Sequence, residues 1–128
     1  MKIAVVGTGY VGLVTGTCFA ETGNSVTCVD VDSEKVSKLS SGEITIYEPG
    51  LEKLFLRNQK EGRLKFTGNL AEAVSDAAIV FLALPTPPGE NGSADLNYVL
   101  GAATELGSLI KPEDFKIVIN KSLSLIHI

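Results

Sequence analysis

The sequence has little cysteine, and the two cysteines that it has are poorly placed for chemistry. Among 128 residues only Cys18 and Cys28 carry a thiol. Cys18 falls within an expected helix and Cys28 within an expected strand, so both are interpreted as small buried hydrophobic residues of a protein in a reducing cytosol. Neither is expected to act as a nucleophile.

Positive charge and long hydrophobic runs are also scarce. Fifteen acidic residues stand against 11 basic ones, and the net charge of −4 provides no basic surface for a nucleic-acid partner. The longest unbroken apolar run, residues 77–84, is far shorter than a membrane-spanning helix, and the amino terminus reaches a glycine-rich turn too soon for a signal peptide. With 45% hydrophobic residues the chain can bury one core, which indicates a single cytoplasmic domain or a piece of one.

The most informative feature is a glycine-rich turn between two apolar runs. Residues 3–6 are apolar, residues 7–12 read Gly-Thr-Gly-Tyr-Val-Gly, and a second apolar run at 26–29 ends on Asp30. Strand, glycine turn, helix, strand and acid in this order predict a dinucleotide-binding unit. Gly7 permits the tight turn, Gly9 lets the backbone approach a pyrophosphate, and Gly12 lets the helix lie close to the sheet. The helix N-terminus then favours the phosphates.

Small residues on the expected first helix support this interpretation. Gly12, Gly16 and Ala20 are four apart and therefore share one helix face, as tight packing on a strand requires. Gly23 follows where a glycine commonly ends a helix. The alternative is that the glycines only shape a turn in some other α/β protein.

Asp30 predicts which dinucleotide is bound. At the end of the second strand its carboxylate can accept hydrogen bonds from both hydroxyls of an adenine ribose. A 2′-phosphate at the same place would be repelled by roughly 4 kcal/mol before screening, which favours NAD over NADP. Lys35, five residues further on, can reach the ribose or the adenine side, although a solvated helix lysine is the simpler interpretation from position alone.

Strands and helices alternate along the rest of the chain. This order predicts an α/β fold, a Rossmann-like doubly wound parallel sheet that is incomplete at its C-terminal edge. Ser33 is expected to cap the second helix, Pro49 to occupy the first position of the third, and Asp95 to cap the last. The last helix is expected to carry one apolar stripe of Leu96, Val99, Leu100, Ala103 and Leu106. The further expected elements are helices at 33–39, 49–60 and 70–74, and strands at 63–66, 78–84 and 115–120.

The loop at residues 85–95 is the second informative segment. In a doubly wound sheet the strand before it neighbours the first strand, so the loop leaves the sheet beside the glycine turn, where ligands bind. Thr86 is therefore expected to face the cofactor. Three prolines within residues 85–88 stiffen the loop, which suits a fixed wall. A rigid connector with an exposed threonine is the alternative.

These motifs together resemble a known family. The turn at 7–12, Asp30 with Lys35, the Ile-Tyr-Glu-Pro-Gly-Leu segment at 46–51, the loop at 85–96 and Asn-Lys-Ser at 120–122 are similar, in order, to the N-terminal domain of nucleotide-sugar dehydrogenases, and within them to UDP-glucose 6-dehydrogenases. GDP-mannose dehydrogenases share the turn and the segment at 46–51, but the loop is more like the UDP-glucose enzymes. Motif and resemblance together imply these NAD-binding residues: Gly7, Gly9, Tyr10, Val11, Gly12, Asp30, Lys35, Thr86 and, near the nicotinamide, Ser122.

The resemblance also implies an activity. The family oxidises a sugar C6 alcohol to a carboxylate in two hydride transfers to NAD, with a catalytic cysteine, lysine and aspartate in later segments. This sequence stops before them, so no catalytic or metal residue is expected in it, and neither are the central helix and the UDP-sugar-binding domain. UDP-glucose and a homo-oligomer are expected of the full-length protein. The alternatives are another NAD-dependent dehydrogenase, acting on GDP-mannose, UDP-N-acetylmannosamine or a hydroxyacid, and a dinucleotide-binding module without chemistry.

The last six residues depart from the family pattern. In the family, Lys-Ser at this point is followed by Thr-Val-Pro. In this sequence, residues 123–128 after Lys-Ser read Leu-Ser-Leu-Ile-His-Ile. A transposon end used in sequencing libraries translates to the same six residues, so they are interpreted as a non-native tail after an NAD-binding domain at 1–122. His127, the only histidine, is accordingly given no catalytic role.

Overall fold

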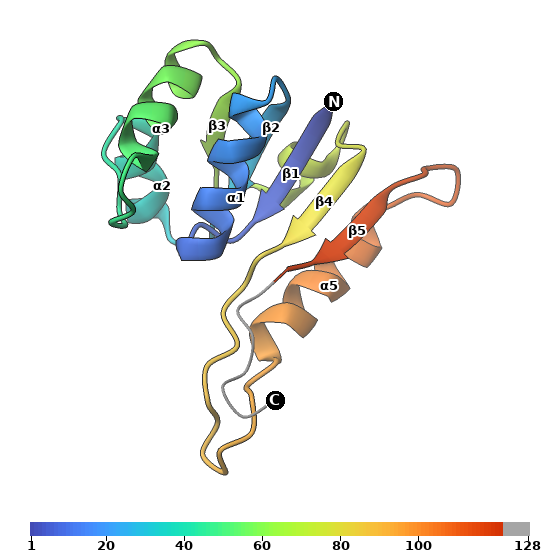
Figure 1. The fold of residues 1–128 in the computed structure, drawn as a ribbon. Helices are drawn as coiled ribbons and strands as arrows, with labels where there is room; N and C mark the ends of the chain where they lie inside the picture. Colours follow the sequence, from blue (N-terminus) through green and yellow to red (C-terminus); the bar gives the residue numbers. More distant parts are fainter. Residues whose placement is uncertain (122–128) are drawn as a thin grey trace.

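The computed structural model describes residues 1–121 and contains one five-stranded sheet (Figure 1). The expectations for Ser122, for the tail at 123–128 and for His127 therefore lie outside the described residues. All strand pairs are parallel, and the spatial order is β3-β2-β1-β4-β5. The strands are β1 (Lys2–Val6), β2 (Ser25–Val29), β3 (Leu64–Thr67), β4 (Ile79–Leu82) and β5 (Ile117–Asn120).

The strand order makes β1 the centre of the sheet. It pairs with β2 on one side and with β4 on the other, so the chain first winds outward to β3 and then restarts from β4 to β5. The point between β1 and β4, where the winding direction reverses, is where ligands bind in open α/β sheets. The expected doubly wound, Rossmann-like sheet is confirmed.

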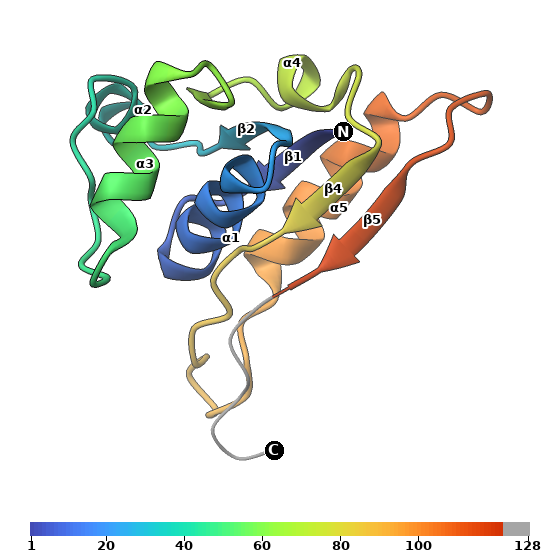
Figure 2. The same cartoon turned by 45° about the horizontal axis from the view of Figure 1, so that its top comes forward.

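Helices cover both faces of the sheet (Figures 1 and 2). Helices α1, α2 and α3 lie over one face, and α4 and α5 lie over the other. Along β1, β2 and β4 both faces of the parallel sheet are thereby largely removed from water, as their near-continuous apolar sequences require. The helices are α1 (Tyr10–Glu21), α2 (Ser33–Ser40), α3 (Leu51–Lys60), α4 (Leu70–Val74) and α5 (Asn97–Leu109).

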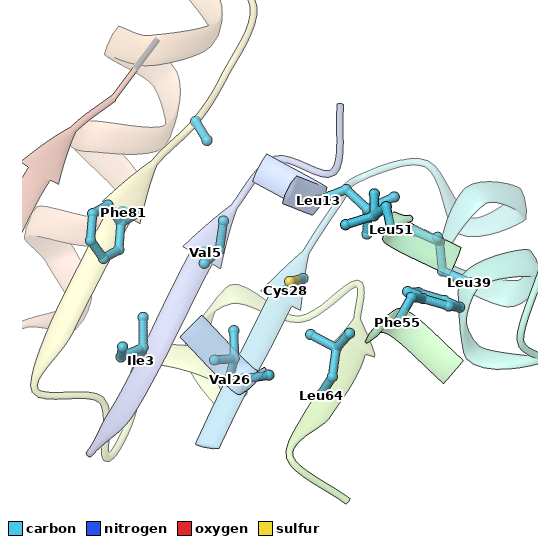
Figure 3. Close-up of a cluster of buried hydrophobic side chains, with 12 residues drawn as sticks. Ile3, Val5, Leu13, Val26, Cys28, Leu39, Leu51, Phe55, Leu64 and Phe81 are labelled. Atoms are coloured by element: carbon cyan, nitrogen blue, oxygen red, sulfur yellow. The ribbon is translucent and has the colours of Figure 1, made fainter. Parts of the chain in front are cut away.

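The alternation of side chains along β1 divides the core into two parts. Ile3 and Val5 point to the face covered by α1 and α3, where they join a cluster with Leu13 and Phe55 (Figure 3). Ala4 and Val6 point to the opposite cluster beneath α4 and α5. Successive residues of a strand face opposite sides, so one short strand anchors both layers.

Helix α1 lies close to the sheet because its inner face is made of small residues. A Cβ on Gly16 would stand 2.7 Å from Cys28 Sγ, and one on Gly12 would stand 1.9 Å from the carbonyl oxygen of Gly7. Cys28 is fully buried, as expected. Cys18 was expected to be buried and is exposed, because it lies on the outer side of α1.

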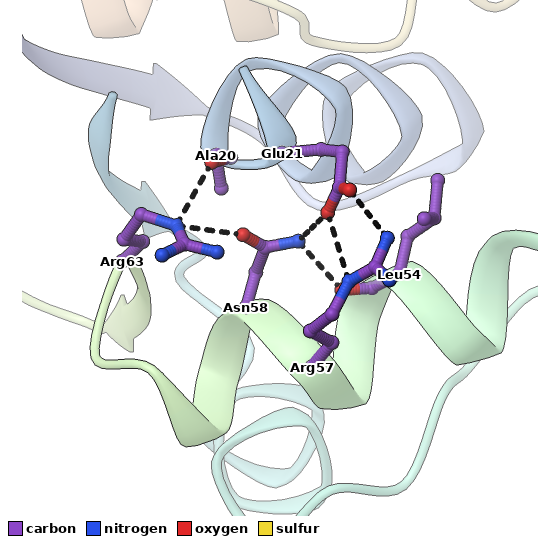
Figure 4. A network of polar contacts seen from close by, with 6 residues as sticks. All are labelled: Ala20, Glu21, Leu54, Arg57, Asn58 and Arg63. Atoms are coloured by element: carbon purple, nitrogen blue, oxygen red, sulfur yellow. Dashed lines mark hydrogen bonds and ion pairs between the residues drawn. The ribbon is translucent and has the colours of Figure 1, made fainter. Parts of the chain in front are cut away.

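A polar cluster joins the end of α1 to α3 (Figure 4). Asn58 is fully buried and donates from its amide to Glu21 Oε2 at 2.6 Å and to the carbonyl oxygen of Leu54 at 2.8 Å. Its own carbonyl oxygen accepts from Arg63 Nε at 2.9 Å, and Arg57 forms an ion pair with Glu21. Every polar atom of the buried amide is thus satisfied, as burial demands.

Three expected helix starts are wrong in detail. The N-cap of α2 is Asp32 rather than Ser33, and its carboxylate accepts from two backbone N–H groups. Pro49 precedes the N-cap of α3, which is Gly50 in the left-handed conformation. Asp95 stands one residue before the N-cap of α5, and its carboxylate accepts from the N–H of Asn97 at 2.9 Å.

The expected apolar stripe of α5 is also wrong in part. Leu106 is buried and Val99 half-buried, but Leu96, Leu100 and Ala103 are exposed. The inner face instead passes through Ala102, Leu106 and Leu109. The apolar residues of α5 occupy more than one face, so their spacing alone did not determine which of them turn inward.

Candidate functional site

A groove of about 1040 Å³ opens at the carboxyl ends of β1, β2 and β4. This is the switch point of the sheet, and segments far apart in sequence meet there. The expected site residues that line the groove are Gly7, Gly9, Tyr10, Val11, Asp30, Lys35 and Thr86. Gly12 does not line it and lies buried behind the turn, and Ser122 lies outside the described residues.

Two glycines of the turn have no room for a side chain, and the third does. Gly7 has φ +107°, and a Cβ there would stand 2.4 Å from the carbonyl oxygen of Ala83. Gly12 has no room for a side chain either. Gly9 differs, because its φ of −73° is open to any residue and a Cβ would meet no atom of the described residues within 4 Å. Nothing in the described fold therefore requires a glycine at position 9.

The N-terminus of α1 faces the same groove without a side-chain cap. Its N-cap is Gly9, no acidic residue stands in its first turn, and its first internal hydrogen bond runs from Leu13 N to Gly9 O. The first N–H groups of a helix have no partner within the helix, and together with the helix dipole they favour an anion. Helices α2 and α4, by contrast, are capped by Asp32 and Asn69.

Asp30 stands directly after β2, and its carboxylate is fixed on both oxygens. Oδ2 accepts from the Thr8 hydroxyl at 2.6 Å and from the Thr8 N–H at 3.1 Å, while Oδ1 accepts from the N–H of Asp32 at 3.0 Å. Lys35 Nζ lies 3.7 Å from Oδ2. Burial by itself raises the pKa of Asp30, but the hydrogen bonds from Thr8 and Asp32 and the charge of Lys35 outweigh it and lower the pKa below its ordinary value. The site therefore holds a fixed negative charge.

The loop after β4 forms one wall of the groove. Residues 84–88 line it, and the loop is closed by a bridge between Pro88 and Ala94 and by a hydrogen bond from Asp95 N to Pro87 O at 2.7 Å. Thr86 is half-buried at this wall, where it was expected. The loop reaches well beyond the sheet (Figure 1).

Several lining residues were missed from the sequence. Thr8, which stands between two glycines of the turn, is buried and donates its hydroxyl to Asp30. The others come from surfaces that only the fold brings together, and they include Val31, Gly68, Leu70, Asn97, Tyr98, Gly101 and Glu105. A signal existed for Val31 alone, as an apolar residue next to the acid.

The residues present fit a dinucleotide. The open space at Gly9 and the uncapped α1 N-terminus suit a pyrophosphate, and the ionised Asp30 suits ribose hydroxyls and disfavours a phosphate. The groove is also open and largely apolar at Val31 and Leu70 beside Asp30, where an aromatic base can pack.

Comparison with known sequences agrees with this geometry. Residues 1–127 match the UDP-glucose/GDP-mannose dehydrogenase family, NAD binding domain. The chain belongs to this family. It is the NAD-binding domain that matches, so NAD is the cofactor of the fold. The alternative of an unrelated α/β protein with a glycine turn is excluded.

Individual relatives of the family are similar over nearly the whole chain. The UDP-glucose 6-dehydrogenase of Pseudomonas aeruginosa is 52% identical over 122 residues, which cover 95% of this chain and 26% of that protein. The UDP-glucose 6-dehydrogenase TuaD of Bacillus subtilis is 48% identical over 121 residues, covering 94% of this chain and 26% of that protein. The chain thus spans about a quarter of the length of these curated relatives.

Solved structures of the family share the fold. A GDP-mannose dehydrogenase from Pseudomonas aeruginosa superposes with a TM-score of 0.92 at 36% identity, over 98% of this chain and 29% of that one. A UDP-glucose dehydrogenase from Pyrobaculum islandicum gives a TM-score of 0.88 at 41% identity, over 94% of this chain and 28% of that one. Within residues 1–121, no helix has the length and apolar character needed to span a membrane.

Proposed function

We propose that this chain is the NAD-binding portion of a UDP-glucose 6-dehydrogenase, which oxidises UDP-glucose to UDP-glucuronate with two molecules of NAD. The observation that carries the choice of sugar is the 52% identity to a relative of that name, against 36% to a GDP-mannose dehydrogenase of similar fold. We propose further that the full-length protein is a cytoplasmic homo-oligomer without nucleic-acid or membrane partners.

Each lining residue has a distinct role in this proposal. The N–H groups at the start of α1 bind the pyrophosphate beside Gly9, with Tyr10 and Val11 at the same turn. Asp30 accepts from the adenine ribose, and Lys35 supports it from α2. Gly7 and, behind the groove, Gly12 shape the turn, and Thr86 faces the cofactor from the opposite wall. Ser122, outside the described residues, is assigned to the nicotinamide end by the family resemblance alone.

The chemistry is divided between this chain and what lies beyond it. When bound in this groove, NAD would supply the hydride acceptor for oxidation of the sugar. The residues of this chain bind and orient the cofactor. The negative charge of Asp30 disfavours a 2′-phosphate on the ribose. By resemblance, the nucleophilic cysteine and the sugar-binding surface belong to other segments, so the chain alone is expected to form no NADH from UDP-glucose.

Cofactor choice is tested by titrating the chain with NAD and with NADP in a calorimeter. We expect the unchanged chain to bind NAD and to discriminate against NADP. Asp30→Ala is expected to weaken NAD binding, because the ribose hydroxyl loses its acceptor. The difference in affinity between NAD and NADP should also become smaller, because the 2′-phosphate of NADP is no longer repelled by a carboxylate. Equal affinity for the two dinucleotides in the unchanged chain would contradict the proposal.

The ability of this NAD-binding portion to serve a UDP-glucose 6-dehydrogenase is tested by a chimera. Residues 1–121 replace the matching segment of the Pseudomonas aeruginosa relative, and NADH absorbance is followed with UDP-glucose and, as the control, with GDP-mannose. We expect the chimera to turn over UDP-glucose and not GDP-mannose. The 128-residue chain by itself should turn over neither. Steady turnover by the pure chain would show that catalytic residues lie within it.

A further inference from the structure

Thr8 makes two hydrogen bonds to a single oxygen of Asp30. Its backbone N–H donates to Oδ2 at 3.1 Å, and its hydroxyl donates to the same oxygen at 2.6 Å. Thr8 is only 1% exposed, although it lies in a turn. The contact ties the turn after β1 to the end of β2, so the position of the acid depends on the residue between the first two glycines.

The hydrogen bonds of Asp30 leave it with one open acceptor position. A carboxylate has about four lone-pair positions, two on each oxygen. Thr8 fills both positions on Oδ2, and the N–H of Asp32 fills one on Oδ1 at 3.0 Å. Lys35 Nζ stands further away, at 3.7 Å from Oδ2. Since the side chain of Asp30 is 13% exposed, a ligand reaches only a small part of it.

We propose that Thr8 is the positioning residue of Asp30: it holds Oδ2 and thereby leaves Oδ1 as the oxygen that accepts from a ribose hydroxyl of NAD. This inference rests on the proposed function, because it assigns Asp30 to the ribose. It also refines the expectation from the sequence that Asp30 receives both ribose hydroxyls, since the clamped carboxylate has room for one.

Preorganisation explains why the clamp strengthens binding. A carboxylate fixed in the free protein loses little conformational freedom when the ligand arrives. The substitution Thr8→Val puts a methyl group in place of the hydroxyl, so Asp30 Oδ2 loses the shorter of its two hydrogen bonds from Thr8. Residue 8 is only 1% exposed, so little solvent reaches the vacated acceptor position to replace the lost donor.

The test compares variants of the 128-residue chain. Thr8→Val removes the hydroxyl and keeps the branched shape, Thr8→Ala removes it with a smaller side chain if valine prevents folding, and Thr8→Ser keeps it. Thr17→Val is the matched control, because Thr17 is fully buried in α1 and its hydroxyl has no hydrogen-bond partner among residues 1–121. Thermal unfolding followed by circular dichroism verifies that each variant folds.

Two measurements separate positioning from mere stability. The first is the titration of the Asp30 carboxyl carbon by NMR in the absence of NAD, and the second is the Kd of NAD by calorimetry. We expect Thr8→Val and Thr8→Ala to raise the pKa of Asp30 and to weaken NAD binding about tenfold, equivalent to about 1.4 kcal/mol. Lys35, the charged group that pairs with Asp30, and the backbone N–H of Asp32 that donates to it are unchanged in every variant. Thr8→Ser and Thr17→Val should match the unchanged chain in both measurements.

Three results would overturn the proposal or its premise. An unchanged pKa of Asp30 together with an unchanged Kd in Thr8→Val would refute it. A loss in Thr8→Ser as large as in Thr8→Val would also refute it, because the hydroxyl would not be the cause. If the unchanged chain binds no NAD, the proposed function fails, and the titration still decides whether Thr8 holds Asp30.

Discussion

At the scale of single residues, the glycines of the turn are required for different reasons. Gly7 and Gly12 are demanded by the fold itself, because a side chain at either would collide with backbone atoms. Gly9 is not, since the space beside it is open within residues 1–121. The fold thus accounts for two of these glycines, and under the proposed function the pyrophosphate of NAD accounts for the third.

This difference separates loss of binding from loss of stability. Gly9→Val should abolish NAD binding by filling the space beside the helix N-terminus while lowering the free energy of unfolding by less than about 1 kcal/mol. Gly12→Val is the contrasting variant and should unfold the domain, since its Cβ alone would stand 1.9 Å from Gly7 O. Calorimetry and thermal unfolding measure the two effects. Unchanged NAD affinity in Gly9→Val would move the site elsewhere.

The two cysteines should differ sharply in reactivity. Burial raises the pKa of Cys28 to about 12, so its reactive thiolate is scarce near neutral pH, and Cys18 is exposed. A chromogenic disulfide reagent at pH 8 should therefore titrate one thiol rapidly in the folded chain and two after denaturation. Cys18→Ser should abolish the rapid phase. A rapid phase that persists in this variant would contradict the burial of Cys28.

Asp30 should contribute pH-dependent stability. Its pKa in the folded chain lies below the ordinary value of 3.8, so its contribution is fully present above that pH and is lost as the pH falls through the folded pKa. Asp30→Asn should therefore lower the free energy of unfolding by about 1–2 kcal/mol at pH 7, and the difference should shrink in acid. Urea unfolding at several pH values measures it. A difference that does not change with pH would contradict the ionised clamp.

At the scale of elements, the α1–α3 interface depends on a buried amide rather than on apolar packing alone. Asn58 donates to Glu21 and accepts from Arg63, which joins two helices to the start of β3 (Figure 4). The hydrogen bond from Asn58 lowers the pKa of Glu21; desolvation opposes this effect and Arg57 reinforces it. The amide thus determines how α3 sits against α1.

Replacing this amide by an apolar side chain should be costly. Asn58→Leu removes the hydrogen bonds that Asn58 makes with Glu21 and Arg63 inside a buried site, and we expect a loss of about 2–3 kcal/mol in the free energy of unfolding although the ion pair of Glu21 with Arg57 remains. Glu52→Gln, at a position in α3 outside the cluster, is the control and should change it by less than about 0.5 kcal/mol. Urea unfolding decides between them. A loss in Asn58→Leu no larger than the control would show that the cluster adds nothing to stability.

At the scale of the whole molecule, the two edges of the sheet differ in how far they are exposed to solvent. Within residues 1–121, β5 pairs with β4 alone, and Ile117 and Val118 are 47% and 44% exposed, with Phe115 before them at 87%. An exposed apolar edge strand can pair with another chain. The opposite edge strand, β3, is better covered, because Leu64 is buried and the strand contacts α2 and α3.

The exposed edge predicts self-association of the isolated chain. Val118→Lys should raise solubility and shift sedimentation toward the monomer, because an edge lysine opposes strand pairing. Lys65→Arg on β3, which preserves the charge, is the control and should leave self-association unchanged. Sedimentation velocity at rising concentration measures the effect. Equal self-association in Val118→Lys and the unchanged chain would place the contact elsewhere.

Much of this protein follows from the sequence by itself. The doubly wound sheet, its strand order around β1 and the turn at residues 7–12 were predicted because period, glycine spacing and the acid at Asp30 are local signals. The placement of Gly7, Gly9, Lys35 and Thr86 along one groove followed from the known geometry of the switch point. The family resemblance, carried by the same motifs, is confirmed.

The tertiary structure decided what depends on contacts between distant segments. No pattern around Thr8 indicated that it would clamp Asp30, because the two are 22 residues apart and meet only when β1 and β2 pair. The exposure of Cys18 and the inner face of α5 were likewise mispredicted, since an apolar residue turns inward only where a neighbouring element covers it. Local spacing fixes the elements, and packing between elements determines which side chains they bury.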